Sequence, residues 1–129
     1  MSWTERELEV AARSDELEVS SRRSDGSLRP AVTIWVVRAG DDVVIRSASG
    51  PGNGWFRRAV TSGVGRVSVG GVTRDVAFEL VDDGGAHVAW HAAVDAAYHA
   101  KYDRYGARIV GSVVGPTAAT ATLRVHPRG

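Results

Sequence analysis

Short β-branched runs, joined in pairs by tight turns, constrain the fold of this chain more than any other feature. The run Ala31–Val37 is nearly all apolar, and a Gly-Asp turn leads from it into a second run, Val43–Ala48. The pattern recurs at Val64–Val69 and Val72–Phe78, which the dipeptide Gly70-Gly71 connects. Such runs are typical of strands, and two-residue glycine turns are typical of hairpins. The sequence therefore predicts consecutive antiparallel strands.

Two further segments complete a predicted set of six strands. Glu16–Ser20 alternates polar and apolar residues in the manner of an edge strand, and Thr120–His126 alternates again as the last strand. Because hairpins predominate and few crossovers are needed, we expect a small barrel rather than a parallel α/β sheet. The predicted fold is mainly β (α+β), a six-stranded antiparallel β-barrel with flanking helices. Its 129 residues are expected to form one domain, 1–129.

Three helices are expected around these strands. The segment from Thr4 to Ala12 begins with a capping box and predicts a short helix. Trp55–Ser62 fits a two-turn helix that the following glycine ends, and the alanine-rich segment His87–Tyr105 fits a longer one. The stretch Ala107–Ala119 contains two glycines and a proline and is expected to be irregular.

Composition and charge exclude several classes of protein. The net charge is +1 and the arginines are scattered, so no general electrostatic attraction favours nucleic acid or an anionic membrane. The chain has no cysteine, which excludes disulfides, thiol catalysis and thiolate metal sites. The longest apolar runs, such as Val32–Val37, are far shorter than the ~20 residues of a membrane-spanning helix. The first residues are acidic and lack an apolar segment, so we expect no signal peptide and a cytoplasmic protein.

The segment that points most clearly to chemistry is the glycine-rich loop after Val43–Ala48. Basic and hydroxyl side chains end the predicted strand, glycines follow, and a helix then begins with one aromatic residue and two arginines. In order these residues are Arg46, Ser47, Ser49, Gly50, Gly52, Gly54, Trp55, Arg57 and Arg58. Backbone amides in such a loop can form a concave anion site. Arg46 has two interpretations, a bidentate phosphate contact from the wall of a cleft or a solvent-facing residue of a one-sided strand.

The two arginines at the start of the predicted helix lie at the positive end of its dipole. A bound anion would compensate for Arg57 or Arg58. Alternatively, Asp41 or Asp42 pairs with them, or both side chains point to water. We favour an anion contact for one arginine and a structural or solvent role for the other.

Aromatic side chains near this loop can form a ring-binding site. Trp35 and Trp55 can stack on a planar ring, although aromatic residues in a domain of this size usually belong to the core, which is the interpretation we favour. Thr33 is more suggestive, because a hydroxyl in an apolar strand needs a hydrogen-bond partner, and a bound ring with polar edge atoms would supply one.

Two patterns in the segment His87–Tyr105 have structural explanations that we favour over chemical ones. Imidazole and carboxylate side chains recur along one face, at a spacing that can hold a metal but without an obvious third protein ligand. We expect a partly solvated helix face there, comprising His87, His91, Asp95 and His99. Three tyrosines recur at i, i+4 and i+7 and are expected to pack against the rest of the protein. They are Tyr98, Tyr102 and Tyr105. The alternative, for Tyr102 or Tyr105, is the role of proton donor to a substrate.

Three short stretches resemble the split β-barrel flavin and deazaflavin reductases. They are Thr33–Val37, Val44–Gly50 and Trp55–Ala59, separated by the Gly-Asp turn and the glycine-rich loop. The reductases include the deazaflavin-dependent nitroreductases and are distantly similar to pyridoxamine-phosphate oxidases. The similarity covers roughly Arg22–Leu80, and the whole chain looks like a small bacterial family of unknown function within that superfamily.

The resemblance implies a six-stranded split barrel that binds FMN or a deazaflavin across a homodimer interface and reduces a small organic substrate. Carried over to this sequence, the resemblance places four residues near the cofactor phosphate: Arg46, Ser47, Ser49 and Gly50. The phosphate would be flanked by Trp55, Arg57 and Arg58, and the ring would be lined by Thr33 and Trp35. The relatives usually have serine where Ala48 stands, a basic residue where Ser49 stands and asparagine near Arg58. Two alternatives stay open: a non-catalytic module for a flavin, haem or other flat ligand, and a structural homodimer whose pocket has decayed.

Overall fold

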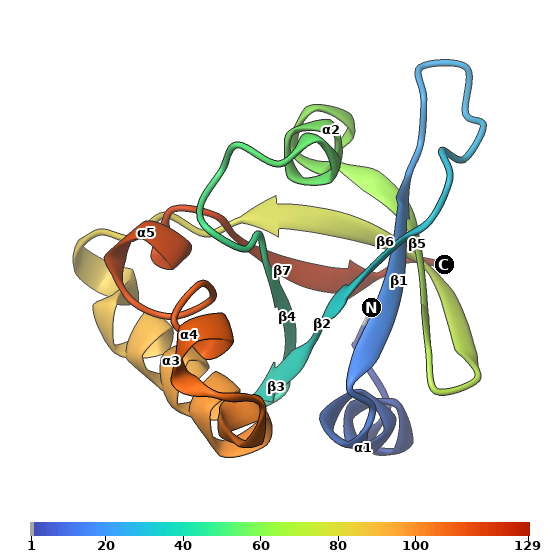
Figure 1. Ribbon diagram of the computed structural model, residues 1–129. Coiled ribbons are helices and arrows are strands. Elements are labelled where there is room, and N and C mark those ends of the chain that lie inside the picture. Colours follow the sequence, from blue (N-terminus) through green and yellow to red (C-terminus); the bar gives the residue numbers. More distant parts are fainter. Residues whose placement is uncertain (1) are drawn as a thin grey trace.

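Residues 2–129, which the computed structural model describes, form one antiparallel sheet of seven strands in the order β2-β1-β5-β6-β7-β4-β3 (Figure 1). The strands are β1 (Glu16–Ser21), β2 (Val32–Trp35), β3 (Val37–Ala39), β4 (Asp42–Arg46), β5 (Val64–Val69), β6 (Val72–Leu80) and β7 (Thr122–Pro127). The two strands at the ends of this order, β2 and β3, are separated in the chain by Val36 alone. The sheet therefore curls round on itself into a nearly closed barrel, which confirms the predicted fold class.

Seven strands replace the predicted six because the expected strand Ala31–Val37 is interrupted at Val36. The Val36 amide donates to the Tyr102 hydroxyl at 3.1 Å, and the Val36 carbonyl accepts a hydrogen bond from the Lys101 ammonium at 2.6 Å. Both partners come from the long helix, more than 60 residues further along the chain. A run of β-branched residues cannot reveal such an interruption, because local propensity contains no information about a distant donor.

The strand β1 lies inside the sheet, so its expected role as an edge strand is wrong. It pairs antiparallel with β2 on one side and β5 on the other, and Val19 lies opposite both Val32 and Val67. Its alternation is that of a strand with one buried face, since Leu17 and Val19 are buried and Glu16 and Glu18 are exposed. Alternation alone indicates a half-buried strand, central or peripheral.

The three predicted helices are present as α1 (Glu5–Arg13), α2 (Gly54–Ser62) and α3 (Val88–Tyr102). The capping box at Thr4 is complete, and α2 ends at Gly63 in the left-handed region, with φ of 75°. Short 3₁₀ turns, η1 (Gly85–His87) and η2 (Asp103–Tyr105), flank α3. The expected irregular stretch 107–119 contains two one-turn helices, α4 (Ala107–Val110) and α5 (Pro116–Ala119). None of the helices in residues 2–129 is both long and apolar enough to cross a bilayer.

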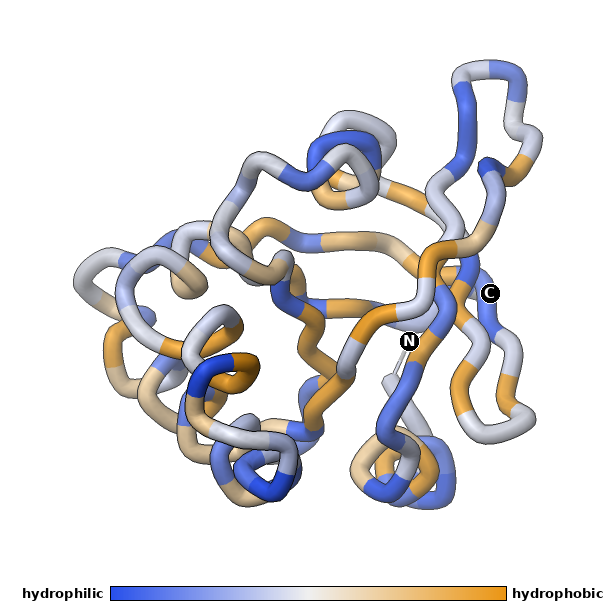
Figure 2. The backbone as a smooth tube through the Cα atoms, in the orientation of Figure 1, coloured by the Kyte–Doolittle hydropathy of each residue, from blue (hydrophilic) through white to orange (hydrophobic). Residues whose placement is uncertain are grey.

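Two apolar clusters stabilise this arrangement. The barrel interior, which includes Leu17, Ile45 and Leu123, is closed by residues of α1 and α2. A second cluster joins β3 and β4 to α3, with Tyr98 and Tyr102 completely buried. The predicted packing of the tyrosines is thereby confirmed for these two residues. Figure 2 shows hydrophobic residues concentrated along the strands and hydrophilic residues along the segment that joins β1 to β2.

Candidate functional site

Two cavities flank the start of α2. The first, the apolar cleft, has a volume of about 280 Å³ and is bordered mainly by Thr33, Ile34, Trp35, Trp55, Ile109 and Val113. The second, the basic groove, has a volume of about 730 Å³ and lies between α2 and the segment that joins β1 to β2. Its charged residues are Arg22, Arg23, Arg29, Arg57 and Arg58. Asn53 and Trp55 border the cleft and Gly54 borders the groove, so the first turn of α2 separates the two cavities.

The apolar cleft has rigid aromatic walls. The half-buried Trp35 ring stacks on the buried Tyr102 ring, with ring centroids 4.0 Å apart and planes 6° from parallel. Trp55 is also half-buried and contacts Phe56 edge to face at 6.0 Å. Both arrangements are favourable aromatic geometries that hold the rings in place. Thr33 is exposed, so solvent can satisfy its hydroxyl, which also remains accessible to a ligand in the cleft.

Several groups of the glycine-rich loop that were predicted to form an anion cradle make hydrogen bonds within the protein. The Ser47 hydroxyl donates to the Gly50 carbonyl at 2.6 Å, the Gly50 amide donates to the Ser47 carbonyl at 3.3 Å, and the Ser49 amide donates to the Ser112 carbonyl at 2.9 Å. Asn53 adds hydrogen bonds from its side-chain amide to the Ser47 hydroxyl and the Ala48 carbonyl, both at 2.8 Å. The Ser47 hydroxyl and the amides of Ser49 and Gly50 are thus engaged within the protein. The sequence could not show this, because the loop closes through Ser112, a residue from another part of the chain.

Arg46 is a buried structural residue, and neither interpretation from the sequence describes it. Its side chain is fully buried. It donates from Nε to Thr122 Oγ1 at 2.9 Å and from Nη1 to the Val113 carbonyl at 2.9 Å and to the Asp95 carboxylate. Nη2 contacts His91 Nδ1 at 3.0 Å. Four of the five N–H donors of the guanidinium are therefore used inside the protein, which leaves no forked pair for a phosphate.

The face of α3 that suggested a metal site supplies the partners of Arg46. A guanidinium can only donate, so His91 Nδ1 accepts, and the ring proton resides on Nε2, which donates to the Asp82 carbonyl at 2.8 Å. Asp95 completes the cluster with an ion pair to Arg46. The prediction that this face is partly solvated is wrong for His91, which is only 6% exposed. His99, further along, is exposed and pairs with Asp103 at 2.8 Å.

The two arginines of α2 face the basic groove as exposed side chains. The alternative that Asp41 or Asp42 neutralises them is wrong. Asp41 lies 3.7 Å from an Arg38 nitrogen, and Asp42 lies 3.5 Å from Arg124 and accepts from Trp90. Within residues 2–129, none of the ion pairs involves Arg57 or Arg58.

A close contact places one of these cations at the positive end of α2. A Cβ atom added to Gly54 would come within 2.7 Å of Arg58 Nη1, so the guanidinium lies directly over the glycine backbone. The N-cap residue Asn53 makes no capping hydrogen bond. A cation in the first turns of a helix is repelled by the positive end of the helix dipole. An anion at that place is attracted both by the dipole and by the guanidinium group. The sequence identified Gly54, Arg57 and Arg58 but missed the arginines of the facing segment, whose only signal is their position around the Asp25-Gly26 turn.

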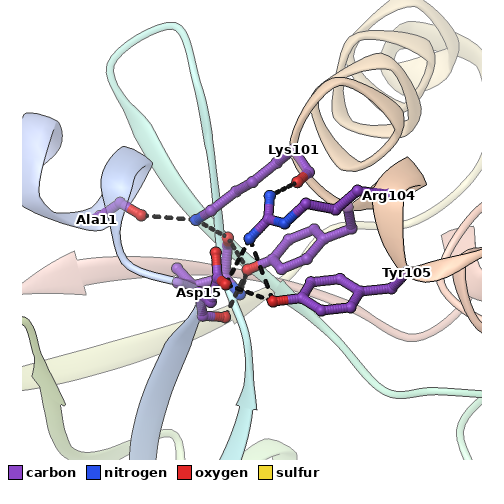
Figure 3. A network of polar contacts seen from close by, with 7 residues as sticks. Ala11, Asp15, Lys101, Arg104 and Tyr105 are labelled. Atoms are coloured by element: carbon purple, nitrogen blue, oxygen red, sulfur yellow. Dashed lines mark hydrogen bonds and ion pairs between the residues drawn. The ribbon is translucent and has the colours of Figure 1, made fainter.

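A polar network joins Lys101 and Arg104 to residues at the end of α1, including Ala11 and Asp15 (Figure 3). The Lys101 ammonium donates to the Ala11 and Val36 carbonyls at 2.9 and 2.6 Å. Burial lowers the pKa of Lys101 to about 8. Hydrogen bonds from Tyr105 and Arg104 lower the pKa of Asp15 below its usual range. The network connects the end of α1, the β2–β3 bend and the end of α3.

Two solved structures share this fold. One is an F420 reductase, which has a TM-score of 0.57 and 12% sequence identity, with 94% of this chain and 92% of that chain covered. The other is an FAD-binding protein from Mesorhizobium loti, which has a TM-score of 0.59 and 15% identity, with 100% of this chain and 93% of that chain covered. At such identities the likeness establishes the fold alone, and it agrees with the expected resemblance to split-barrel proteins. A comparison with curated proteins found no match.

A family model matches nearly the whole chain, from residue 7 to residue 125. Its description is that of an uncharacterized protein conserved in bacteria. The match confirms the expected bacterial family. This chain belongs to the DUF2255 family.

Proposed function

We propose that this protein binds a flavin-type cofactor, FMN or a deazaflavin, with the ring in the apolar cleft and the phosphate in the basic groove, and that it reduces a small organic substrate. One observation carries the proposal. The cleft and the groove lie on either side of the first turn of α2, where Trp55 borders the cleft while Gly54 and Arg58 border the groove. A ligand with a flat ring and an anionic tail is complementary to two such neighbouring cavities.

The dimensions of the two cavities fit this division. Ligand sites usually measure roughly 300–1,000 Å³, and the cleft, at about 280 Å³, is large enough for a ring system but not for a complete nucleotide. The tail must therefore leave the cleft, and the neighbouring groove offers uncompensated guanidinium groups. The glycine at position 54 has no side chain, which lets the Arg58 guanidinium lie over the backbone between the two cavities.

Within this site the residues of the chain bind, orient and shield the ring. Trp35 and Trp55 form the apolar walls, the Thr33 hydroxyl can hydrogen-bond the polar edge of a ring, and Arg57 and Arg58 supply charge for the phosphate. A flavin-type cofactor, when bound, supplies hydride chemistry of its own, so the protein's contribution is orientation and exclusion of water. The names of the two structural neighbours, an F420 reductase and an FAD-binding protein, support a cofactor of this class. The homodimer implied by the resemblance stays a prediction.

Titration of the purified protein with FMN, FAD and a deazaflavin tests the proposal, with quenching of the cofactor fluorescence and thermal stability as readouts. We expect saturable binding of at least one cofactor, and a ligand at 100 times its Kd stabilises the folded state by about 2.7 kcal/mol. Arg58→Ala should weaken this binding about tenfold, because a charge-assisted hydrogen bond is lost. Arg13→Ala removes the same charge from an exposed position outside both cavities and should have little effect.

Failure of all three cofactors to bind would contradict the proposal. If a cofactor binds, oxidation of a reduced nicotinamide or of a reduced deazaflavin by a nitroaromatic acceptor separates a reductase from a non-catalytic carrier. A carrier would bind the cofactor with the same dependence on Arg58 but would show no turnover. Scattering measurements at micromolar protein concentration would test the predicted homodimer.

A further inference from the structure

The basic groove holds more positive charge than a single phosphate requires. Its guanidinium groups come from two facing walls, Arg57 and Arg58 on α2 and Arg23 and Arg29 on the segment that joins β1 to β2. In the part of the chain that the structure describes, none of these four side chains takes part in an ion pair. Arg22, the fifth arginine, is held at 3.1 Å from Asp75 at the edge of the groove. Four cations thus border one cavity without an ion-pair partner among the described residues, and one of them, Arg23, also donates to the Ser27 hydroxyl at 3.3 Å and to the Leu28 carbonyl at 3.1 Å.

The wall formed by the joining segment is an ordered turn. Arg22 and Leu28 form an isolated β-bridge, the Gly26 amide donates to the Arg23 carbonyl at 2.9 Å, and the Arg23 amide donates to the Ser27 carbonyl at 2.8 Å. The Arg22 side chain also donates to the Gly26 carbonyl at 2.7 Å. These contacts hold the two arms of the turn together, one with Arg22 and Arg23 and the other with Arg29, opposite α2.

We propose that the basic groove is a binding site for a ligand with two or more linked phosphate groups, bound between the two walls. A terminal phosphate group carries about −1.5 to −2 charges near pH 7, so one such group leaves about half of the four positive charges unmatched, and a second linked phosphate adds negative charge that matches more of them. Guanidinium groups also match phosphate oxygens in bidentate geometry. The groove, at about 730 Å³, has the size of a small-molecule site, and the net charge of the chain is only +1, which favours a small polyanion over nucleic acid.

This inference rests on the groove alone and does not require the flavin site. Isothermal titration with inorganic phosphate and with pyrophosphate, at low and at 0.5 M sodium chloride, tests it directly. We expect pyrophosphate to bind with 1:1 stoichiometry, at least about tenfold more tightly than phosphate, since the second group adds charge-assisted hydrogen bonds. The added salt should weaken the interaction strongly, because it screens exposed charges.

Variants in each wall identify the site. Arg29→Ala and Arg58→Ala should each weaken pyrophosphate binding about tenfold and should reduce its preference over phosphate. The control Arg13→Ala changes net charge equally and should leave both affinities unchanged, and circular dichroism confirms that the variants are folded. Equal affinity for phosphate and pyrophosphate, absence of pyrophosphate binding, or an equal loss in Arg13→Ala would overturn the proposal.

Competition distinguishes the two sources of linked phosphates, a dinucleotide cofactor and a free nucleotide or pyrophosphate. Displacement of pyrophosphate by FAD but not by FMN assigns the linked phosphates to a dinucleotide cofactor. Simultaneous binding of pyrophosphate and a flavin assigns the groove to a separate ligand, for which ADP is the next probe. Either result supports a site for linked phosphates. If pyrophosphate binds and no flavin does, the groove site stands and the proposed cofactor function fails.

Discussion

Two tyrosines of α3 show how much the partner of a buried hydroxyl matters. Tyr98 and Tyr102 are both completely buried. The Tyr102 hydroxyl accepts from the Val36 amide at 3.1 Å and lies 2.6 Å from the Asp15 carbonyl, whereas the Tyr98 hydroxyl has no hydrogen-bond partner among residues 2–129. Tyr102→Phe should therefore lower the free energy of unfolding by about 1–3 kcal/mol, and Tyr98→Phe should leave it unchanged or raise it by about 1 kcal/mol. Urea denaturation of both variants measures the difference, and equal losses would contradict this account.

At the same scale, the partners of Arg46 are a part of the site that the sequence could not predict. The place of Arg46 before a glycine-rich loop correctly marked it as unusual, but its acceptors lie 45 to 76 residues away and come from α3, β7 and the segment before α5. An arginine that binds phosphate and one that ties a barrel together look identical in a single sequence. Arg57 and Arg58 were identifiable because their helical position makes a local electrostatic argument. The arginines of the facing wall could not be identified in this way, because only the fold brings the segment that joins β1 to β2 opposite α2.

At the scale of elements, Gly65 allows β1 and β5 to approach closely. A Cβ atom at this position would lie 2.1 Å from the Ser20 carbonyl oxygen and 2.9 Å from Phe78 Cε2. Because one obstacle is backbone, the strands must move apart, and Gly65→Ala should cost about 1–3 kcal/mol of stability. Gly52→Ala is the matched control, since its Cβ would meet nothing within 4 Å and its φ is not positive. Chemical denaturation and amide exchange of β1 measure the effect. Equal stability of Gly65→Ala and Gly52→Ala would contradict this explanation.

The elements themselves were largely predictable, because their signals are local. Glycine turns, alternation and caps placed five strands and three helices close to their observed bounds. The errors share one physical cause. The split at Val36, the interior position of β1 and the one-turn helices α4 and α5 all depend on contacts with distant segments. Helices of four residues in particular have no periodicity to detect and are stabilised by their surroundings.

At the scale of the whole molecule, the polar network around Lys101 connects parts of the chain that the barrel sheet does not. Its ammonium holds α1 and the β2–β3 bend to the end of α3, through the carbonyls of Ala11 and Val36 (Figure 3). The neutral amine keeps two N–H donors and can retain both hydrogen bonds. Deprotonation of Lys101 therefore removes its charge but leaves its two hydrogen bonds in place. The effect of this deprotonation on the free energy of unfolding then follows from the difference in the pKa of Lys101 between the folded and unfolded chain.

The stability of the molecule should rise with pH between about 8 and 10 because of Lys101. Burial lowers the pKa of Lys101 from 10.5 to about 8 in the folded state, so over this range the unfolded chain binds more protons, and the free energy of unfolding increases with pH. Above pH 10 the sign reverses. Burial raises the pKa of Tyr102 above its usual 10.0, so the unfolded chain loses that proton first and stability falls. Urea denaturation of the wild type and of Lys101→Met at half-unit pH steps isolates the lysine. The variant should be less stable at every pH, but its profile should lack the rise between pH 8 and 10 and keep the fall above it, and the same rise in both proteins would show that another group causes it.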